Sequence, residues 1–160
     1  AIATVGNAEK KALCESWGAD LVVDYHSTDL DEQISQFTES NGLHVWFETQ
    51  REPTPDRTVG FMTQRGRIIF MAGRAARPEF PVGPFYVKDL RLVGFAMFNA
   101  SAEEQRASAE AINAAFEQGH WKPQIGRTFA LSEAAAAHQL QEDNTLNGTG
   151  TLTGKIVLTP

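Results

Sequence analysis

Hydrophobic and polar positions follow two alternating periods along this chain. Short apolar runs rich in β-branched and aromatic residues predict strands, and stretches with an apolar residue every three or four positions predict helices. The strands are expected at residues 2–5, 21–25, 44–48, 66–73, 91–97, 125–130 and 155–158. The helices are expected at residues 8–17, from 30 up to Asn41, around 58–64 and 85–89, from 101 up to Gly119, and at 132–141. This alternation predicts a parallel α/β sheet with right-handed crossovers.

Residues at the helix ends support these limits. Asn7 can cap the first helix, and Gly18 can end it. The segment 28–32 supplies capping and acidic first-turn residues for the second helix. Ser101 and Glu104 have the spacing of a capping box at the start of the long helix.

The carboxyl ends of parallel strands meet at one edge of a sheet, where ligands bind. Here those ends are Val5-Gly6-Asn7, Asp24-Tyr25, Glu48-Thr49 and Met71-Ala72-Gly73. Lys10 and Lys11 follow in the first turn of the first helix, where the helix dipole favours negative charge by about 0.3–1 kcal/mol. Two interpretations remain open at this point, a phosphate held by Lys10 or a pair of solvated lysines.

Bulk composition narrows the function classes. A chain of 160 residues has the length of one domain, and a net charge of -6 disfavours general binding to nucleic acids or anionic membranes. Cys14 is the single cysteine, and the histidines match no metal-ligand spacing, so no metal site is expected. Gly148-Thr-Gly150 follows a helix and precedes a strand, the reverse of a phosphate loop's context. We expect a cytoplasmic protein.

Several motifs occur in a fixed order and carry a resemblance. They are Thr4-Val-Gly-Asn-Ala-Glu-Lys10, Gly18-Ala-Asp20, Val23-Asp-Tyr25, Gly66-Arg-Ile-Ile-Phe-Met-Ala-Gly73, Pro84-Phe-Tyr-Val-Lys-Asp89, Leu92-Val-Gly-Phe95, Lys122-Pro-Gln-Ile-Gly126 and Gly154-Lys-Ile-Val-Leu-Thr-Pro160. The ordered set resembles the cofactor-binding and C-terminal portion of the medium-chain dehydrogenase/reductase superfamily. It is most similar to the zinc-free NADPH:quinone oxidoreductase, zeta-crystallin-like branch.

The resemblance implies a Rossmann-like, doubly wound parallel sheet that lacks its first strand, which carries the glycine fingerprint. Residues 1–126 would be a partial dinucleotide-binding domain. Residues 127–160 would be a C-terminal segment, with a helix and a strand that belong to an absent GroES-like substrate domain. The chain starts directly on a strand, so we expect it to be part of a longer polypeptide.

The missing strand would be the centre of the strand order 3-2-1-4-5-6. We therefore expect residues 2–5 and 45–48, on one side, to be unable to pair with residues 67–71 on the other. Exposed strand edges of this kind invite association with another chain.

The resemblance also implies a cofactor site. Gly6 and Lys10 would approach the adenosine 2′-phosphate, with Tyr25 beside it. The nicotinamide end would run, largely through backbone groups, past Phe70, Met71, Ala72, Gly73, Phe95, Ala96 and Met97. The first strand does not end on the acid that typically selects NAD, and a cation follows it, which favours NADPH. No catalytic residue and no metal ligand is assigned.

Three further residues have two interpretations each. Arg74 could reach a phosphate or a partner subunit, or be an ordinary surface arginine. Glu48 could be catalytic or make structural hydrogen bonds. Phe98, with Phe70 and Phe95, could be core and pocket wall or a stacking platform for nucleic acid, and we expect the former.

The expected function is hydride transfer from NADPH to a quinone or a similar α,β-unsaturated carbonyl compound in a homodimer, with this portion inactive by itself. Two alternatives remain, a non-enzymatic crystallin-like or RNA-binding protein and the enoyl reductase module of a multidomain synthase.

Overall fold

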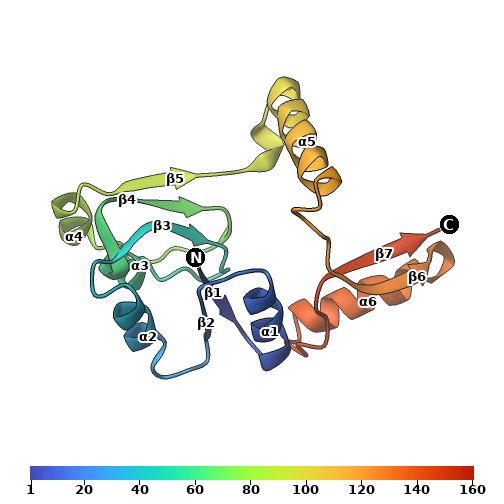
Figure 1. Ribbon diagram of the computed structural model, residues 1–160, viewed down its shortest axis with the longest axis horizontal. Helices are drawn as coiled ribbons and strands as arrows, with labels where there is room; N and C mark the ends of the chain where they lie inside the picture. Colours follow the sequence, from blue (N-terminus) through green and yellow to red (C-terminus); the bar gives the residue numbers. More distant parts are fainter. The chain divides into compact units, whose positions relative to one another are not determined.

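The computed structural model describes all residues from 1 to 160, and they form alternating strands and helices (Figure 1). The strands are β1 (Ile2–Val5), β2 (Leu21–Asp24), β3 (Leu43–Glu48), β4 (Met62–Phe70), β5 (Arg91–Gly94), β6 (Ile125–Ala130) and β7 (Lys155–Thr159). The helices are α1 (Ala8–Ser16), α2 (Leu30–Phe37), α3 (Pro55–Phe61), α4 (Val82–Val87), α5 (Ala102–Glu117) and α6 (Ala134–Thr145), with short 3-10 turns at Met97–Asn99 and Leu131–Glu133. The predicted α/β class is confirmed, and the limits of individual elements shift by a few residues.

The chain divides into two compact units, each described here by itself. The first comprises residues 1–5 and 14–100, and the second comprises residues 6–13 and 101–160. The first unit contains the sheets β1-β2 and β3-β4-β5, and the second contains the sheet β6-β7. All strand pairs are parallel, as predicted. No helix is long and apolar enough to cross a membrane.

The break in the sheet lies in a different place from the one expected. Residues 45–48 do pair with residues 67–70, because Val45 lies opposite Arg67 and Glu48 lies opposite Phe70. The expectation that they lie beside residues 2–5 and cannot reach β4 is therefore wrong. The connection through α3 carries the chain from β3 to the neighbouring position in the sheet, as consecutive strands commonly pair. The sheet is interrupted between β1 and β3.

A groove marks this interruption within the first unit. β1 pairs only with β2, and β3 pairs only with β4, so each has one edge without a strand partner. The groove has a volume of about 540 Å³. Its lining comes from β1, α2 and β3 with flanking residues, and includes Ala1, Ile2, Thr4, Ile34, Phe37, Thr38, Leu43, Val45, Trp46, Phe47 and Thr49. A gap in the sheet is thus present, but it lies between β1 and β3 and not between β3 and β4.

Side chains alone bridge this gap. One buried cluster contains Val59, Met62, Ile68 and Leu90. A second contains Val23, Leu30 and Ile34. Leu43, at the start of β3, packs against both clusters, so it links the two sheets of the first unit without a backbone hydrogen bond.

Lys88 fixes the end of α3. Its ammonium Nζ donates hydrogen bonds of 2.9 Å to the carbonyl oxygens of Val59, Gly60 and Met62. The last carbonyl groups of a helix have no partner inside the helix, and a cation there also interacts favourably with the helix dipole. Lys88 therefore joins the segment after α4 to the connection between α3 and β4.

The capping predictions are confirmed at two helices and differ at the third. The backbone N–H of Lys10 donates to Asn7 Oδ1 at 2.9 Å, which makes Asn7 the cap of α1. Both hydrogen bonds of the capping box between Ser101 and Glu104 are present at α5. At α2 the capping position is Asp29, whose carboxylate accepts from the side chains of Ser27 and Gln33 and not from the helix backbone.

The capping box at α5 makes the stability of the protein depend on pH. The hydrogen bonds that Glu104 receives from Ser101 hold the pKa of its carboxyl below the ordinary value of 4.5. A carboxyl whose pKa is lowered by folding stabilises the protein above its unfolded pKa, and this stabilisation is lost as the pH falls through the folded pKa. We expect the melting temperature of Glu104→Gln to lie below that of the unsubstituted protein at about pH 7 and to converge with it at about pH 3.

Glu103→Gln is the matched control, because the Glu103 side chain accepts no hydrogen bond in the structure. A constant difference in melting temperature between Glu104→Gln and the unsubstituted protein across this pH range would contradict the prediction.

Candidate functional site

The turn between β1 and α1 is the place where the sequence predicts an anion site. β1 ends at Val5, Gly6 and Asn7 form the turn, and α1 begins at Ala8. The N–H of Lys11 donates to the Asn7 carbonyl at 3.1 Å, so the first turn of α1 is closed on Asn7 from both the backbone and the side chain. The structure shows no hydrogen bond or ion pair for the Lys10 ammonium, so its charge is free for a ligand.

Tyr25 lies beside the end of β1. Its backbone N–H donates to the Val5 carbonyl at 2.9 Å, which extends the pairing of β1 and β2 by one residue. Its side chain is 50% exposed, and its ring is tilted against the His26 ring with the centroids 4.4 Å apart. Tyr25 is therefore an exposed aromatic surface at the strand end, while its predicted contact with a nucleotide stays a prediction.

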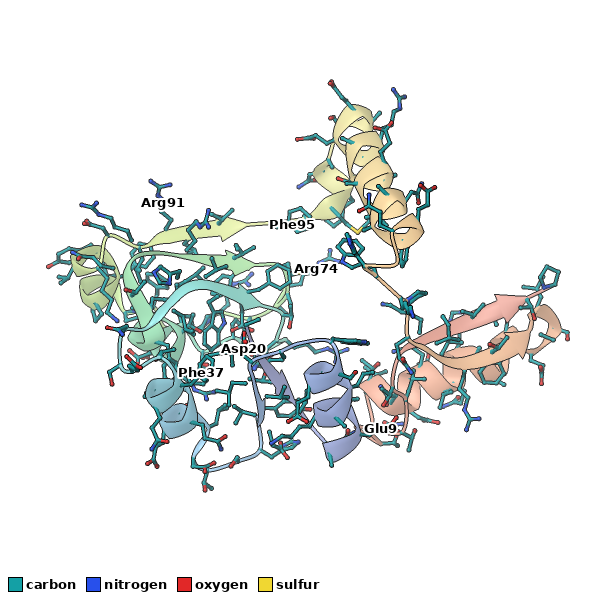
Figure 2. The ribbon with its side chains drawn as sticks, viewed as in Figure 1. Glu9, Asp20, Phe37, Arg74, Arg91 and Phe95 are labelled. Carbon is teal, nitrogen blue, oxygen red and sulfur yellow. The ribbon has the colours of Figure 1, made fainter.

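A second cluster of predicted residues lines a cavity of about 440 Å³ after β4 and β5. The lining residues are Met71, Ala72, Arg74, Phe95, Ala96, Met97 and Phe98. The N–H of Phe95 donates to the Phe70 carbonyl at 2.9 Å, which holds the two strand ends together. The volume lies within the usual range of ligand pockets, about 300–1,000 Å³. Figure 2 shows Arg74 and Phe95 at this same end of the sheet.

Phe70 and Gly73 do not line this cavity. Phe70 packs against the cluster that contains Ile68, because residues two apart on a strand share a face. Gly73 shapes the turn. Its φ is +79°, and a Cβ at this position would lie 3.1 Å from Pro53 Cδ and 3.2 Å from the Arg51 carbonyl oxygen. Gly73 thus allows the chain to turn close to the 51–53 loop and brings Arg74 to the cavity.

Glu48 makes structural hydrogen bonds. It is only 3% exposed, and its two carboxylate oxygens accept from Trp46 Nε1 at 3.1 Å and from the Gln50 N–H at 2.8 Å. Its carbonyl also accepts from the N–H of Met71 at 3.3 Å. Glu48 therefore holds the loop after β3 against the end of β4, beside the cavity and not in its lining.

Phe98 was expected to be core or pocket wall, and it lines the cavity. The hydrogen bonds of the Lys88 side chain were not anticipated from the sequence. The bonds of Lys88 span from 26 to 29 residues, so no local pattern could signal them. No three His, Cys, Asp or Glu side chains come together in a group that could hold a metal ion.

The comparisons with known proteins agree with this fold. A family model described as zinc-binding dehydrogenase matches residues 1–114. Human quinone oxidoreductase is 25% identical over 157 residues, which cover 98% of this chain and 46% of that protein. The chain therefore spans just under half the length of this curated relative.

Two solved structures share the fold. The crystal structure of 2-haloacrylate reductase superposes with a TM-score of 0.80 at 24% identity, covering 99% of this chain and 49% of that one. A mycobacterial protein complexed with NADPH superposes with a TM-score of 0.79 at 22% identity, again covering 99% of this chain and 49% of that one.

Proposed function

The chain belongs to the zinc-binding dehydrogenase family, and from this we propose that it is the cofactor-binding portion of an NADPH-dependent oxidoreductase. The acceptor would be a quinone or a similar α,β-unsaturated carbonyl compound. The observation that carries the proposal is the cavity after β4 and β5. Five of the residues that line this cavity were expected at the nicotinamide end, namely Met71, Ala72, Phe95, Ala96 and Met97.

Two regions support the fit to a nicotinamide cofactor, the turn after β1 and the cavity after β4 and β5. The turn at Gly6 and Asn7 leads into a capped helix that carries a free lysine, as a phosphate group requires. The cavity after β4 and β5 supplies apolar walls for a flat ring. When bound, NADPH would supply the hydride. The solved relative in complex with NADPH and the relatives named as quinone oxidoreductases support this choice.

The chain's own residues would then bind, orient and exclude water. Lys10 would hold the 2′-phosphate, with Gly6 and Tyr25 beside it, and so select NADPH over NADH. Met71, Phe95 and Met97 would shield the acceptor from solvent. No side chain needs to act as acid or base, because two electrons and one hydrogen reach the acceptor as hydride and a proton from water completes the reduction. We therefore assign no catalytic residue and propose a zinc-free reaction.

The proposal extends to the rest of the protein. Residues 127–160 would complete a GroES-like substrate domain, and residues 1–160 alone would be inactive because much of the acceptor site would lie in that domain. β5 is the outer strand of its sheet, and all four of its residues are exposed. This edge would pair with a second copy in a cytoplasmic homodimer.

A cofactor titration tests the proposal. The natural protein that contains these residues should bind NADPH at least about tenfold more tightly than NADH, since charge-assisted hydrogen bonds contribute about 1.5–3 kcal/mol. Tryptophan fluorescence would report binding independently of turnover. Equal affinities, or tighter binding of NADH, would contradict the assignment of NADPH.

A further inference from the structure

Arg74 is the charged residue of the cavity after β4 and β5. The other lining residues are apolar, and include two methionines and two phenylalanines. Phe98 lines the cavity and is 82% exposed, so its ring is accessible to a ligand there. Arg74 is also exposed, so its guanidinium is accessible to an anion at the margin of this cavity.

No side chain of the structure neutralises this cation. The guanidinium of Arg57 pairs with Asp31, and that of Arg77 donates to the Ala76 carbonyl at 2.7 Å. Arg74 has no such hydrogen bond or ion pair, and its backbone follows directly on the turn that Gly73 requires. The turn at Gly73 therefore sets the backbone position of Arg74, while the charge of its side chain remains available.

The chemistry of guanidinium points to a carboxylate. Guanidinium is planar and always charged, and it pairs with a carboxylate through two parallel hydrogen bonds. A ligand packed against the apolar lining residues would displace water from around the guanidinium, which strengthens such a bond. In the proposed function, this cavity faces the hydride end of the cofactor, whereas the 2′-phosphate would lie at the turn between β1 and α1. The anion at Arg74 is thus expected to come from the acceptor.

Building on the proposed function, we propose that Arg74 selects acceptors that carry a carboxylate next to their reducible double bond. The flat apolar part of the acceptor would lie against Phe95 and Met97. Hydride would add to one end of the conjugated system as its π bond breaks, and water would supply the proton, while NADPH is oxidised to NADP⁺. Arg74 would hold the carboxylate and take no part in proton transfer.

The test compares 1,4-naphthoquinone-2-carboxylate with its methyl ester in the natural protein. Arg74→Gln should lower kcat/KM for the carboxylate by about tenfold or more, since the lost bond is charge-assisted. It should leave kcat/KM for the ester within about twofold and the Kd of NADPH unchanged. Arg77→Gln is the matched control, because Arg77 lies three residues away and does not line the cavity.

Two outcomes would overturn the inference. An equal loss for the carboxylate and the ester would mean that Arg74 does not recognise the anion. Weaker NADPH binding with an unchanged preference between the acceptors would place a cofactor phosphate at Arg74.

Binding measured by calorimetry without turnover separates this inference from the proposed function. If neither quinone is reduced, yet the carboxylate binds more tightly than the ester and only while Arg74 is present, the proposed function fails and the carboxylate site stands. If both quinones are reduced and Arg74→Gln changes neither binding nor kcat/KM, the proposed function stands and the carboxylate site fails.

Discussion

Replacing Lys10 with alanine is expected to weaken NADPH binding by about 10- to 100-fold and to leave NADH binding within about twofold. The Lys10 ammonium is free of partners, and its backbone is held by Asn7 at the start of α1. Its removal would take one charge-assisted bond from the 2′-phosphate, a group that NADH lacks. Fluorescence titration of both dinucleotides against the natural protein measures the two losses separately.

Lys11→Ala is the matched control for this experiment. It removes the same charge one residue further along the same helix turn, so a general electrostatic effect would appear equally in both variants. Equal loss of NADPH affinity in Lys10→Ala and Lys11→Ala, or equal loss of NADPH and NADH in Lys10→Ala, would remove Lys10 from the 2′-phosphate site.

Lys88→Met is expected to lower the free energy of unfolding by about 3 kcal/mol, because charged hydrogen bonds contribute about 1.5–3 kcal/mol and partly buried carbonyls lose their donor. Methionine keeps the apolar stem of the side chain and removes the ammonium. The lost bonds are the three of 2.9 Å to Val59, Gly60 and Met62. Urea unfolding monitored by tryptophan fluorescence measures the change.

Lys122→Met is the control for this variant, because Lys122 is exposed and the structure shows no side-chain bond for it. We expect a change of less than about 0.5 kcal/mol there, as for other surface substitutions. If Lys88→Met also lowers the free energy of unfolding by less than about 0.5 kcal/mol, water replaces the ammonium at the end of α3 and the prediction is wrong.

Local patterns predicted the elements well, because local interactions determine them. The capping box of Ser101 and Glu104 and the cap at Asn7 depend on neighbours within one helix turn, and both are present. The order of strands in the sheet depends on which side each crossover takes. The residues of β3 do not indicate on which side of the gap this strand lies, so residues 45–48 were placed on the wrong side.

The candidate site was predictable to the level of strand ends but not of side-chain directions. Met71 and Phe95 were expected at a ligand, and both line the cavity. Phe70 was expected with them, largely through its backbone, and strand alternation turns its ring toward the cluster of Ile68. The placement of Arg74 depends on the positive φ of Gly73 and on the loop at Pro53. Those constraints arise only when segments distant in sequence come together.

The groove between β1 and β3 bears on how the first unit unfolds. Its sheets β1-β2 and β3-β4-β5 share packed side chains at Leu43 but no backbone hydrogen bond. Side-chain packing without a continuous hydrogen-bond ladder couples two segments weakly, so one sheet can open while the other persists. A strand seated along both free edges would connect every strand of the unit into one ladder. A strand that paired with both edges would therefore raise the cooperativity of unfolding of the whole unit.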